Sequence, residues 1–250
     1  MKTQIKNPDE IIAIRKSGQI LAEILKIVAE ATVPGITTKQ LDTLAAKELE
    51  KRGAKAAFLG YNNFPASICI SVNDEIVHGI PSGRVVQNGD LVGLDFGVNY
   101  EGMITDSAVT VAVGSIPKNA EKLLDYTQRA LHAGIGELRD GVRVGDISSA
   151  IGAQLELGGL KVIDTLGGHG VGHTVHEDPY IANFGMRGTG EILRAGMTIA
   201  LEPIASLGTH ECELASDNWT YVTSDNSLSA QFEHTILITQ DGAEILTELH

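Results

Sequence analysis

Apolar residues recur every three to four positions in some stretches of the chain and alternate with polar residues in others. The first spacing, which places apolar side chains on one face of a helix, predicts helices over residues 9–31, 37–52, 117–138 and 144–157. Pro34-Gly35 ends the first of these helices. Thr37 and Gln40 form a capping box at the start of the second helix, and Gly53 stops it.

Strand-like segments occupy residues 68–77, 91–113 and 161–164, and most of the chain from Met197 onward. Each half of the sequence therefore contains helices followed or framed by strands that carry acidic residues. This pattern indicates an α+β fold and is compatible with two pseudo-equivalent halves around a central sheet, although the sequence itself repeats only faintly. Since no low-complexity linker divides the chain, we expect residues 1–250 to form a single domain.

The segment LVGLDFGVNYEGMITDSAVT, residues 91–110, reads as two strands around a polar turn. With Tyr100 and Glu101 as the central turn residues, Asp95 faces Asp106 directly across the hairpin, at a Cβ separation of about 4.5–5.5 Å. Two carboxylates at that distance repel unless a proton or a metal lies between them. The pair suits a site for two metals about 3.5–4 Å apart. Two solvated aspartates near a turn would give the same pattern.

The segment GGHGVGHTVHEDP contains His169, His173 and His176. Its spacing does not match a helical HExxH zinc motif, because Pro179 would break a helix there. It also lacks the last glycine of a GxGxxG dinucleotide fingerprint. A lone histidine in a strand is usually a packed core residue, but flanking glycines allow close backbone approach and favour His169 as a ligand.

Glu202 and Glu233 lie in the strand-like segments MTIALEP and SAQFEHTILI. A glutamate within an apolar strand costs several kcal/mol unless it is paired or bound to a metal. Either strand alone could instead present a solvated polar face. Together with the aspartate pair and His169, the two glutamates predict an oxygen-rich site for two metal ions.

These segments, in this order, resemble the type I methionine aminopeptidases of the pita-bread metallopeptidase superfamily. The resemblance runs from about residue 8 to residue 248, and also includes YNNFPASICISVNDEIVHGIP and DNWTYVTSDNSLSAQFEHTILIT. It implies a pita-bread fold, a pseudo-two-fold antiparallel sheet with helices on its outer face. It also implies five ligands for two divalent metal ions: Asp95, Asp106, His169, Glu202 and Glu233.

The resemblance further implies removal of the initiator methionine from peptides with a small second residue. Glu202 would act as general base and His176 would stabilise the tetrahedral intermediate, while His78 would contact the substrate near the scissile nitrogen. Asp95 would help to hold the free amine of the substrate. The expected methionine pocket, which His78 and His176 adjoin, comprises Phe58, Tyr61, Phe64, Cys69 and Trp219. Ordinary core packing would explain any one of these five residues equally well.

Two positions depart from the family pattern. Val77 stands where many type I enzymes have cysteine, and Val175 stands where a bulkier aromatic residue often lies. Neither change removes a ligand or a catalytic histidine, so both bear on the shape of the pocket. The family ligand set leaves the native metal open among Co, Mn, Fe, Zn and Ni, and availability in the cell decides between them.

Composition narrows the class of partner. A net charge of −13 argues against nucleic acid as the main ligand. Two cysteines give no disulfide framework, and neither a signal peptide nor a membrane-spanning apolar run is present. We therefore expect a soluble cytoplasmic protein. The resemblance implies that it acts on nascent polypeptide N-termini, and we expect a monomer, with contacts to the ribosome left open.

Two other functions fit parts of the pattern. An Xaa-Pro dipeptidase shares the fold and the ligands but usually carries an additional N-terminal domain, for which this chain has no room. A non-enzymatic binding module on the same fold would have lost metal ligands, whereas all five are present here.

Overall fold

The computed structural model describes residues 4–249, and the outermost residues of the expected domain lie outside this range. Its helices match the four predicted ones to within a few residues at each end, with α3 stopping short of Leu138. A short 3-10 helix, η1 (Tyr61–Asn63), was not predicted. The α-helices are α1 (Pro8–Ala31), α2 (Thr38–Lys51), α3 (Lys118–Ile135) and α4 (Val144–Leu157).

Local sequence explains where the first two helices begin. The Asn7 side chain accepts hydrogen bonds from the backbone N–H groups of Asp9 and Glu10, and the Glu10 carboxylate accepts one from the Asn7 N–H. The predicted capping box of Thr37 and Gln40 is confirmed at the start of α2. Gly53 follows α2 in the left-handed region at φ +65°, where glycine has no steric penalty.

The strands form two larger sheets and two small ones. In the first sheet β4 pairs with β1, β2 and β5, and the second has the order β15-β14-β9-β7-β8. The small sheets have the orders β13-β10-β6 and β11-β12-β3. The strands are β1 (Lys55–Ala56), β2 (Cys69–Val72), β3 (Glu75–Val77), β4 (Leu91–Tyr100), β5 (Met103–Ala112), β6 (Lys161–Val162), β7 (Gly167–Gly170), β8 (Glu177–Ala182), β9 (Thr198–Leu201), β10 (Ile204–Ser206), β11 (Cys212–Leu214), β12 (Tyr221–Thr223), β13 (Ser229–Gln231), β14 (His234–Ile238) and β15 (Ala243–Ile245).

The two halves meet where β5 runs beside β13 and β14. The backbones of Glu233 and Ala108 exchange hydrogen bonds of 2.8 and 3.3 Å. Thr235 Oγ1 accepts from Asp106 N at 2.7 Å, and Thr110 Oγ1 donates to the Gln231 carbonyl oxygen at 2.8 Å. This contact of β5 with β13 and β14, the seam between the halves, places Asp106 from the first half next to Glu233 from the second.

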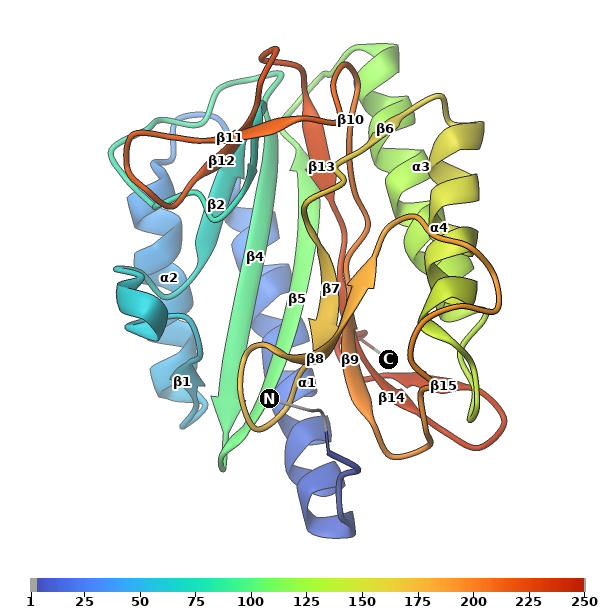
Figure 1. Ribbon diagram of the computed structural model, residues 1–250. Coiled ribbons are helices and arrows are strands. Elements are labelled where there is room, and N and C mark those ends of the chain that lie inside the picture. Colours follow the sequence, from blue (N-terminus) through green and yellow to red (C-terminus); the bar gives the residue numbers. More distant parts are fainter. Residues whose placement is uncertain (1–3, 250) are drawn as a thin grey trace.

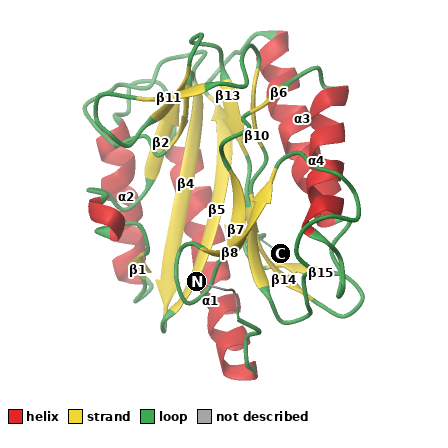
Figure 2. Ribbon diagram, in the orientation of Figure 1, coloured by secondary structure: helices red, strands yellow, loops and turns green. Residues whose placement is uncertain are grey.

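Helices cover one side of these sheets (Figures 1 and 2). Leucine, isoleucine and valine side chains of α1 and α2 form one apolar core with β2 and β4. Side chains of α3 and α4 form another with β9, β13 and β14. Two cores of this kind, one per half, confirm the predicted pseudo-two-fold arrangement with helices on the outer face.

The register of the β4–β5 hairpin differs from the predicted one. Tyr100 pairs with Met103, so Asp95 lies opposite Ala108 and Asp106 lies opposite Gly97. The central turn residues are Glu101 and Gly102, both at positive φ (51° and 87°), as the two-residue turns favoured in hairpins require.

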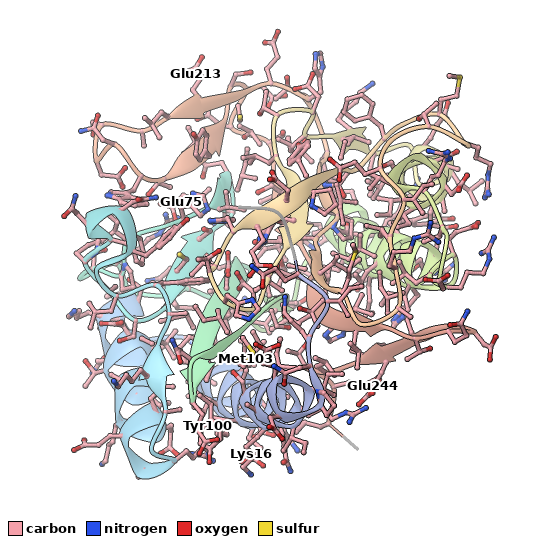
Figure 3. The ribbon with its side chains drawn as sticks, turned by 60° about the horizontal axis from the view of Figure 1, so that its bottom comes forward. Lys16, Glu75, Tyr100, Met103, Glu213 and Glu244 are labelled. Atoms are coloured by element: carbon pink, nitrogen blue, oxygen red, sulfur yellow. The ribbon has the colours of Figure 1, made fainter. Side chains whose placement is uncertain are left out.

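The prediction of directly opposed aspartates was therefore wrong, because Tyr100 stays in the strand and packs against the first core. Figure 3 shows Tyr100 and Met103 at this end of the hairpin, beside α1. A shift of two in the register keeps side chains on the same face, so Asp95 and Asp106 are diagonal neighbours instead.

Candidate metal centre and substrate pocket

One cavity of about 130 Å³ gathers all the site residues predicted from the sequence. It lies between the two halves, since its walls come from β2, β4 and β5 on one side and from β7 and the β9 and β14 segments on the other. Sequence reasoning did not select one of its lining residues, Asn62, and it named Val175 only as a position that bears on the shape of the pocket. The lining residues are Phe58, Tyr61, Asn62, Phe64, Cys69, His78, Asp95, Asp106, His169, Val175, His176, Glu202, Trp219 and Glu233.

Potential metal donors cluster at the buried end of this set. Asp106, His169 and Glu233 each offer a donor atom, and these atoms all lie within 4.8 Å of one another. Glu202 Oε1 lies 3.6 Å from His169 Nε2. Oδ1 of Asp95 and Oδ1 of Asp106 are buried without a hydrogen-bond partner. Buried carboxylate oxygens without protein partners are what a bound cation would satisfy.

The electrostatics of the cluster also favour a cation. Burial raises the pKa of Asp95 to about 7. Burial, reinforced by the neighbouring carboxylates, raises the pKa of Asp106, Glu202 and Glu233 well above the usual range. Four carboxylates in a desolvated space resist carrying negative charge together, and divalent ions remove that cost. The donor set therefore fits divalent metal ions.

The backbone of Gly170 orients the ring of His169. Its Nδ1 lies 2.9 Å from the Gly170 carbonyl oxygen, which can only accept, so the proton resides on Nδ1 and Nε2 keeps its lone pair. Burial lowers the pKa of His169 to about 3, which keeps the ring neutral. A neutral imidazole with a free Nε2 is the form that binds metal.

The glycines around His169 are needed for close packing, as the sequence predicted. A Cβ on Gly168 would lie 2.4 Å from the Ala200 carbonyl oxygen of β9. A Cβ on Gly170 would lie 2.4 Å from the Asp178 carbonyl oxygen of β8. Only glycine allows β7 to fit between these two strands, and this fit sets the depth of His169.

Glu202 and Glu233 occupy a break shared by two neighbouring strand lines. Leu201 pairs with His234 before the break, and Ile204 pairs with Gln231 after it. Glu202-Pro203 and Phe232-Glu233 lie between these pairs, outside the named strands, where proline has no N–H for a ladder. The interruption places both glutamates at the cavity, and Gln231 Nε2 donates to Glu202 Oε2 at 3.1 Å.

His78 and His176 border the donor cluster. The centroids of the His169 and His176 rings lie 4.4 Å apart, and Tyr61 Oη lies 2.9 Å from His176 Nδ1. Desolvation lowers the pKa of His176, although the residue is open to solvent. Burial lowers the pKa of His78 to about 4. His78 has φ +60°, a strained backbone conformation that collects at functional sites and that the sequence did not reveal.

Aromatic side chains form the other wall of the cavity. The rings of Phe64 and Trp219 meet edge to face with their centroids 5.1 Å apart. Phe58 and Cys69 are buried, and Cys69 pairs with Asp95 across β2 and β4. This wall adjoins the carboxylates, so an apolar side chain held here would place its attached backbone at the donor cluster.

The two-half fold and the buried donor set fit a metal-dependent enzyme, and comparison with known proteins supplies the family. The profile of metallopeptidase family M24 matches residues 12–240, and the chain belongs to this family. It is 47% identical to a protein named methionine aminopeptidase from Aquifex aeolicus, over 100% of both chains. It is 42% identical to methionine aminopeptidase 1 of Bacillus subtilis, over 98% of both chains.

Solved structures agree with this placement. A crystal structure of methionine aminopeptidase from Thermotoga maritima superposes with a TM-score of 0.97 at 43% identity, covering 99% of this chain and 100% of that one. A prolidase from Pyrococcus furiosus, 22% identical, has a TM-score of 0.78 and is covered over 66% of its own length, against 98% of this chain. This second likeness shows the shared fold alone, and together they confirm the expected pita-bread fold.

Proposed function

We propose that this chain is a metal-dependent aminopeptidase that removes the N-terminal methionine from proteins and peptides. The observation that carries the proposal is one cavity in which an acidic donor cluster adjoins an aromatic wall. Relatives of 38–47% identity over nearly the whole chain, all named methionine aminopeptidases, support it. The metallopeptidase family implies dependence on divalent metal ions.

We assign two ions to this cluster, held by Asp95, Asp106, His169, Glu202 and Glu233. The buried unpartnered oxygens of Asp95 and Asp106 support the assignment, as do the raised pKa values of the four carboxyls. When bound, such ions polarise the scissile carbonyl and make water a nucleophile at neutral pH. The ligand types are compatible with Co, Mn, Fe, Zn or Ni.

Glu202 is our candidate for the general base. Its carboxyl group lies within the donor cluster, with Oε1 3.6 Å from His169 Nε2, where it can take a proton during the reaction and pass it on. The hydrogen bond from Gln231 holds one of its oxygens and leaves the other for proton transfer. Asp95, the neighbouring carboxylate, would attract the positively charged free amine, which restricts cleavage to the first residue.

His176 and His78 would contact the substrate rather than the ions. Tyr61 Oη engages His176 Nδ1, which leaves Nε2 as the nitrogen available to the substrate carbonyl. His78 would contact the substrate near the scissile nitrogen. Because the second residue of the substrate would lie between these two rings, we expect a preference for glycine, alanine or serine there.

The aromatic wall would receive the first side chain. Phe58, Tyr61, Phe64, Cys69 and Trp219 enclose an apolar space that accepts a flexible, unbranched thioether. The substrates are protein N-termini, and nascent chains are our proposed source of them. We further propose that residues 1–250 act as a single-domain monomer in the cytoplasm. Among the residues that the structure describes, no helix is long and apolar enough to cross a membrane.

Three tripeptide classes test this function. Met-Ala-Ser should be cleaved, Leu-Ala-Ser should be cleaved far more slowly, and Ala-Pro peptides should resist. A chelator should abolish cleavage, and Mn²⁺, Co²⁺ or Fe²⁺ should restore it. Preference for Ala-Pro would instead identify an Xaa-Pro peptidase, and no metal-dependent cleavage of any peptide would indicate a binding module.

The second position of the substrate gives an independent test. Met-Gly, Met-Ala and Met-Ser peptides should be cleaved at least tenfold faster than Met-Leu or Met-Lys peptides, because a pocket between two rings excludes bulk. One missing methylene is worth only about 1–3 kcal/mol in an apolar pocket, so norleucine in place of methionine should remain a substrate. Equal rates for Met-Ala and Met-Leu would refute the small second subsite.

A further inference from the structure

The segment before α1 lies against the turn that joins β7 to β8 (Figure 1). The Lys6 N–H donates to the Gly196 carbonyl oxygen at 2.8 Å. The Lys6 ammonium lies 3.3 Å from Glu177 Oε2, and the side chains of the pair are 0% and 1% exposed. It also donates to the Gln4 carbonyl oxygen at 3.1 Å. A fully buried ion pair thus connects the N-terminal segment to the start of β8.

The side chain of Glu177 points back into that turn and holds it together. Its Oε1 accepts the N–H groups of His173 and Thr174 at 2.7 and 3.2 Å. Thr174 Oγ1 in turn donates to the His176 carbonyl oxygen at 2.9 Å. The turn is therefore folded around one carboxylate, and His176 directly precedes that carboxylate in the chain.

Packing leaves Lys6 little freedom. A Cβ on Gly172 would lie 2.5 Å from Lys6 Cε and 2.8 Å from Lys6 Nζ. Gly172 has φ +146°, and its carbonyl oxygen accepts from Ile104 N at 2.7 Å. The lysine stem therefore rests directly on the backbone of the turn.

A second contact joins the same two segments. Glu10 Oε1 lies 3.0 Å from His173 Nε2, while Glu10 Oε2 accepts the Asn7 N–H that caps α1. The start of α1 therefore holds the turn at two residues, Glu177 through Lys6 and His173 through Glu10.

We propose that Lys6 is a positioning residue for His176, whose buried ammonium holds the 172–177 turn in the conformation that brings the His176 ring to the cavity. This inference rests on the role of His176 in the proposed function. Without the ammonium, Glu177 Oε2 would lose a buried cation that lies 3.3 Å away, and removing one partner of a buried ion pair is strongly destabilising. The loss would disturb the two N–H groups that Glu177 Oε1 accepts and hence the backbone next to His176.

Steady-state kinetics on Met-Ala-Ser provide the first readout. Lys6→Met should lower kcat at least tenfold, while KM and metal content stay within twofold of the wild type, because a small misplacement of a catalytic group is costly. Lys26→Met is the matched control, since Lys26 is an exposed α1 lysine paired with Glu30 at 3.9 Å. It should leave kcat unchanged. A kcat for Lys6→Met within threefold of the wild type would overturn the proposal.

A double-mutant cycle shows whether Lys6 acts through His176. In a His176→Ala background, Lys6→Met should lower kcat by less than twofold, because the group that it positions is gone. An equal fold loss in both backgrounds would mean a general structural role and would overturn the proposal. Glu10→Gln, which keeps an oxygen for the α1 cap, should show the same cycle with a smaller loss, and it serves if Lys6→Met does not fold.

Histidine-labelled NMR spectra separate this inference from the proposed function. The His176 ring signal, assigned by its absence in His176→Ala, should shift or broaden in Lys6→Met and stay unchanged in Lys26→Met. This readout does not depend on cleavage of any peptide. An unchanged His176 signal in folded Lys6→Met would overturn the inference, whereas a wild-type protein inactive on Met-Ala-Ser would overturn only the function.

Discussion

The two halves of the molecule are built on the same frame. Helices α2 and α4 both have 14 residues. Each follows a positive-φ glycine, Gly35 or Gly141, and each is followed by another, Gly53 or Gly159. The N-cap residues also match, because both form isolated bridges, Thr37 to Val85 and Arg143 to Ile192. Each half packs its own apolar core, and the candidate site lies where the two halves meet.

The halves differ in how they deliver functional side chains. The first half contributes Asp95 and Asp106 from one continuous hairpin of two ten-residue strands. The second contributes His169 from a four-residue strand and two glutamates from a break between strands. The regular half contributes two carboxylates from one strand pair, and the interrupted half brings one imidazole and two further carboxylates next to them. Neither half alone holds the five proposed ligands.

The largest expected effect comes from removing one ligand on each side of the seam. Asp106→Asn and Glu233→Ala should each abolish turnover, because a lost carboxylate removes charge that the ions need. Metal content should fall toward one ion or fewer per chain, measured by atomic emission after dialysis. The two halves should thus be equally indispensable.

A suitable control for this pair is Asp125→Asn on α3, since Asp125 is exposed and neither it nor its partner Arg129 lines the cavity. It should retain activity and metal. Wild-type turnover with both ions retained in either ligand variant would contradict the ligand assignment and the shared role of the halves.

The next effect tests the regular half alone. A Cβ on Gly97 would lie 2.5 Å from Phe58 Cε1, whereas a Cβ on Gly93 in the same strand meets nothing closer than 3.5 Å. Gly97→Ala should therefore push Phe58 into the pocket and raise KM for Met-Ala-Ser about tenfold, the cost of roughly one methylene. Gly93→Ala should leave KM unchanged. Equal KM values in the two variants would show that Phe58 does not shape the pocket.

The contrast between the halves also explains what the sequence could predict. Helical periodicity and capping residues located all four helices, and alternation placed Asp95 and Asp106 on one face despite the error of two in the register. The error arose because turn type depends on which residues accept positive φ, and Glu101 accepts it here. A register shift of two residues leaves the predicted face of each side chain correct, but it changes the predicted distance between two side chains.

The interrupted half was harder to predict from its residues alone. Alternation assigned Glu202 and Glu233 to strands, but both lie in a break that depends on pairing across the sheet. The left-handed backbone of His78 and the position of Val175 in the cavity likewise depend on long-range packing. The resemblance to a known family, which rests on the order of the motifs, assigned these four residues to the site or its pocket. Local sequence patterns alone could not have located them there.

The metal-free protein should lose stability as pH rises, because the seam brings together four buried carboxyls. Their pKa values are raised in the folded state, so these four carboxyls bind more protons in the folded protein than in the unfolded chain above pH about 4. Their contribution is favourable below that pH and is lost as pH rises through about 7, the folded pKa of Asp95.

Melting temperatures after chelation should therefore be lower at pH 8 than at pH 5.5, and added Mn²⁺ should remove most of the difference. Asp106→Asn should flatten the dependence, because it takes away one of the coupled charges. A chelated wild-type protein that is equally stable at both pH values would show that the carboxyls are not desolvated together.

The smallest expected effect returns to the shared frame. Thr37 Oγ1 accepts from Gln40 N at 3.2 Å, whereas the Arg143 side chain at the equivalent position has no oxygen that could accept such a bond. Thr37→Ala should lower the free energy of unfolding by about 1 kcal/mol, the usual value of such a cap, while Arg143→Ala should change it by less than about 0.5 kcal/mol. Urea titration of both variants in the metal-loaded state measures the difference. Equal losses would mean that the N-caps of α2 and α4 contribute equally to the free energy of unfolding.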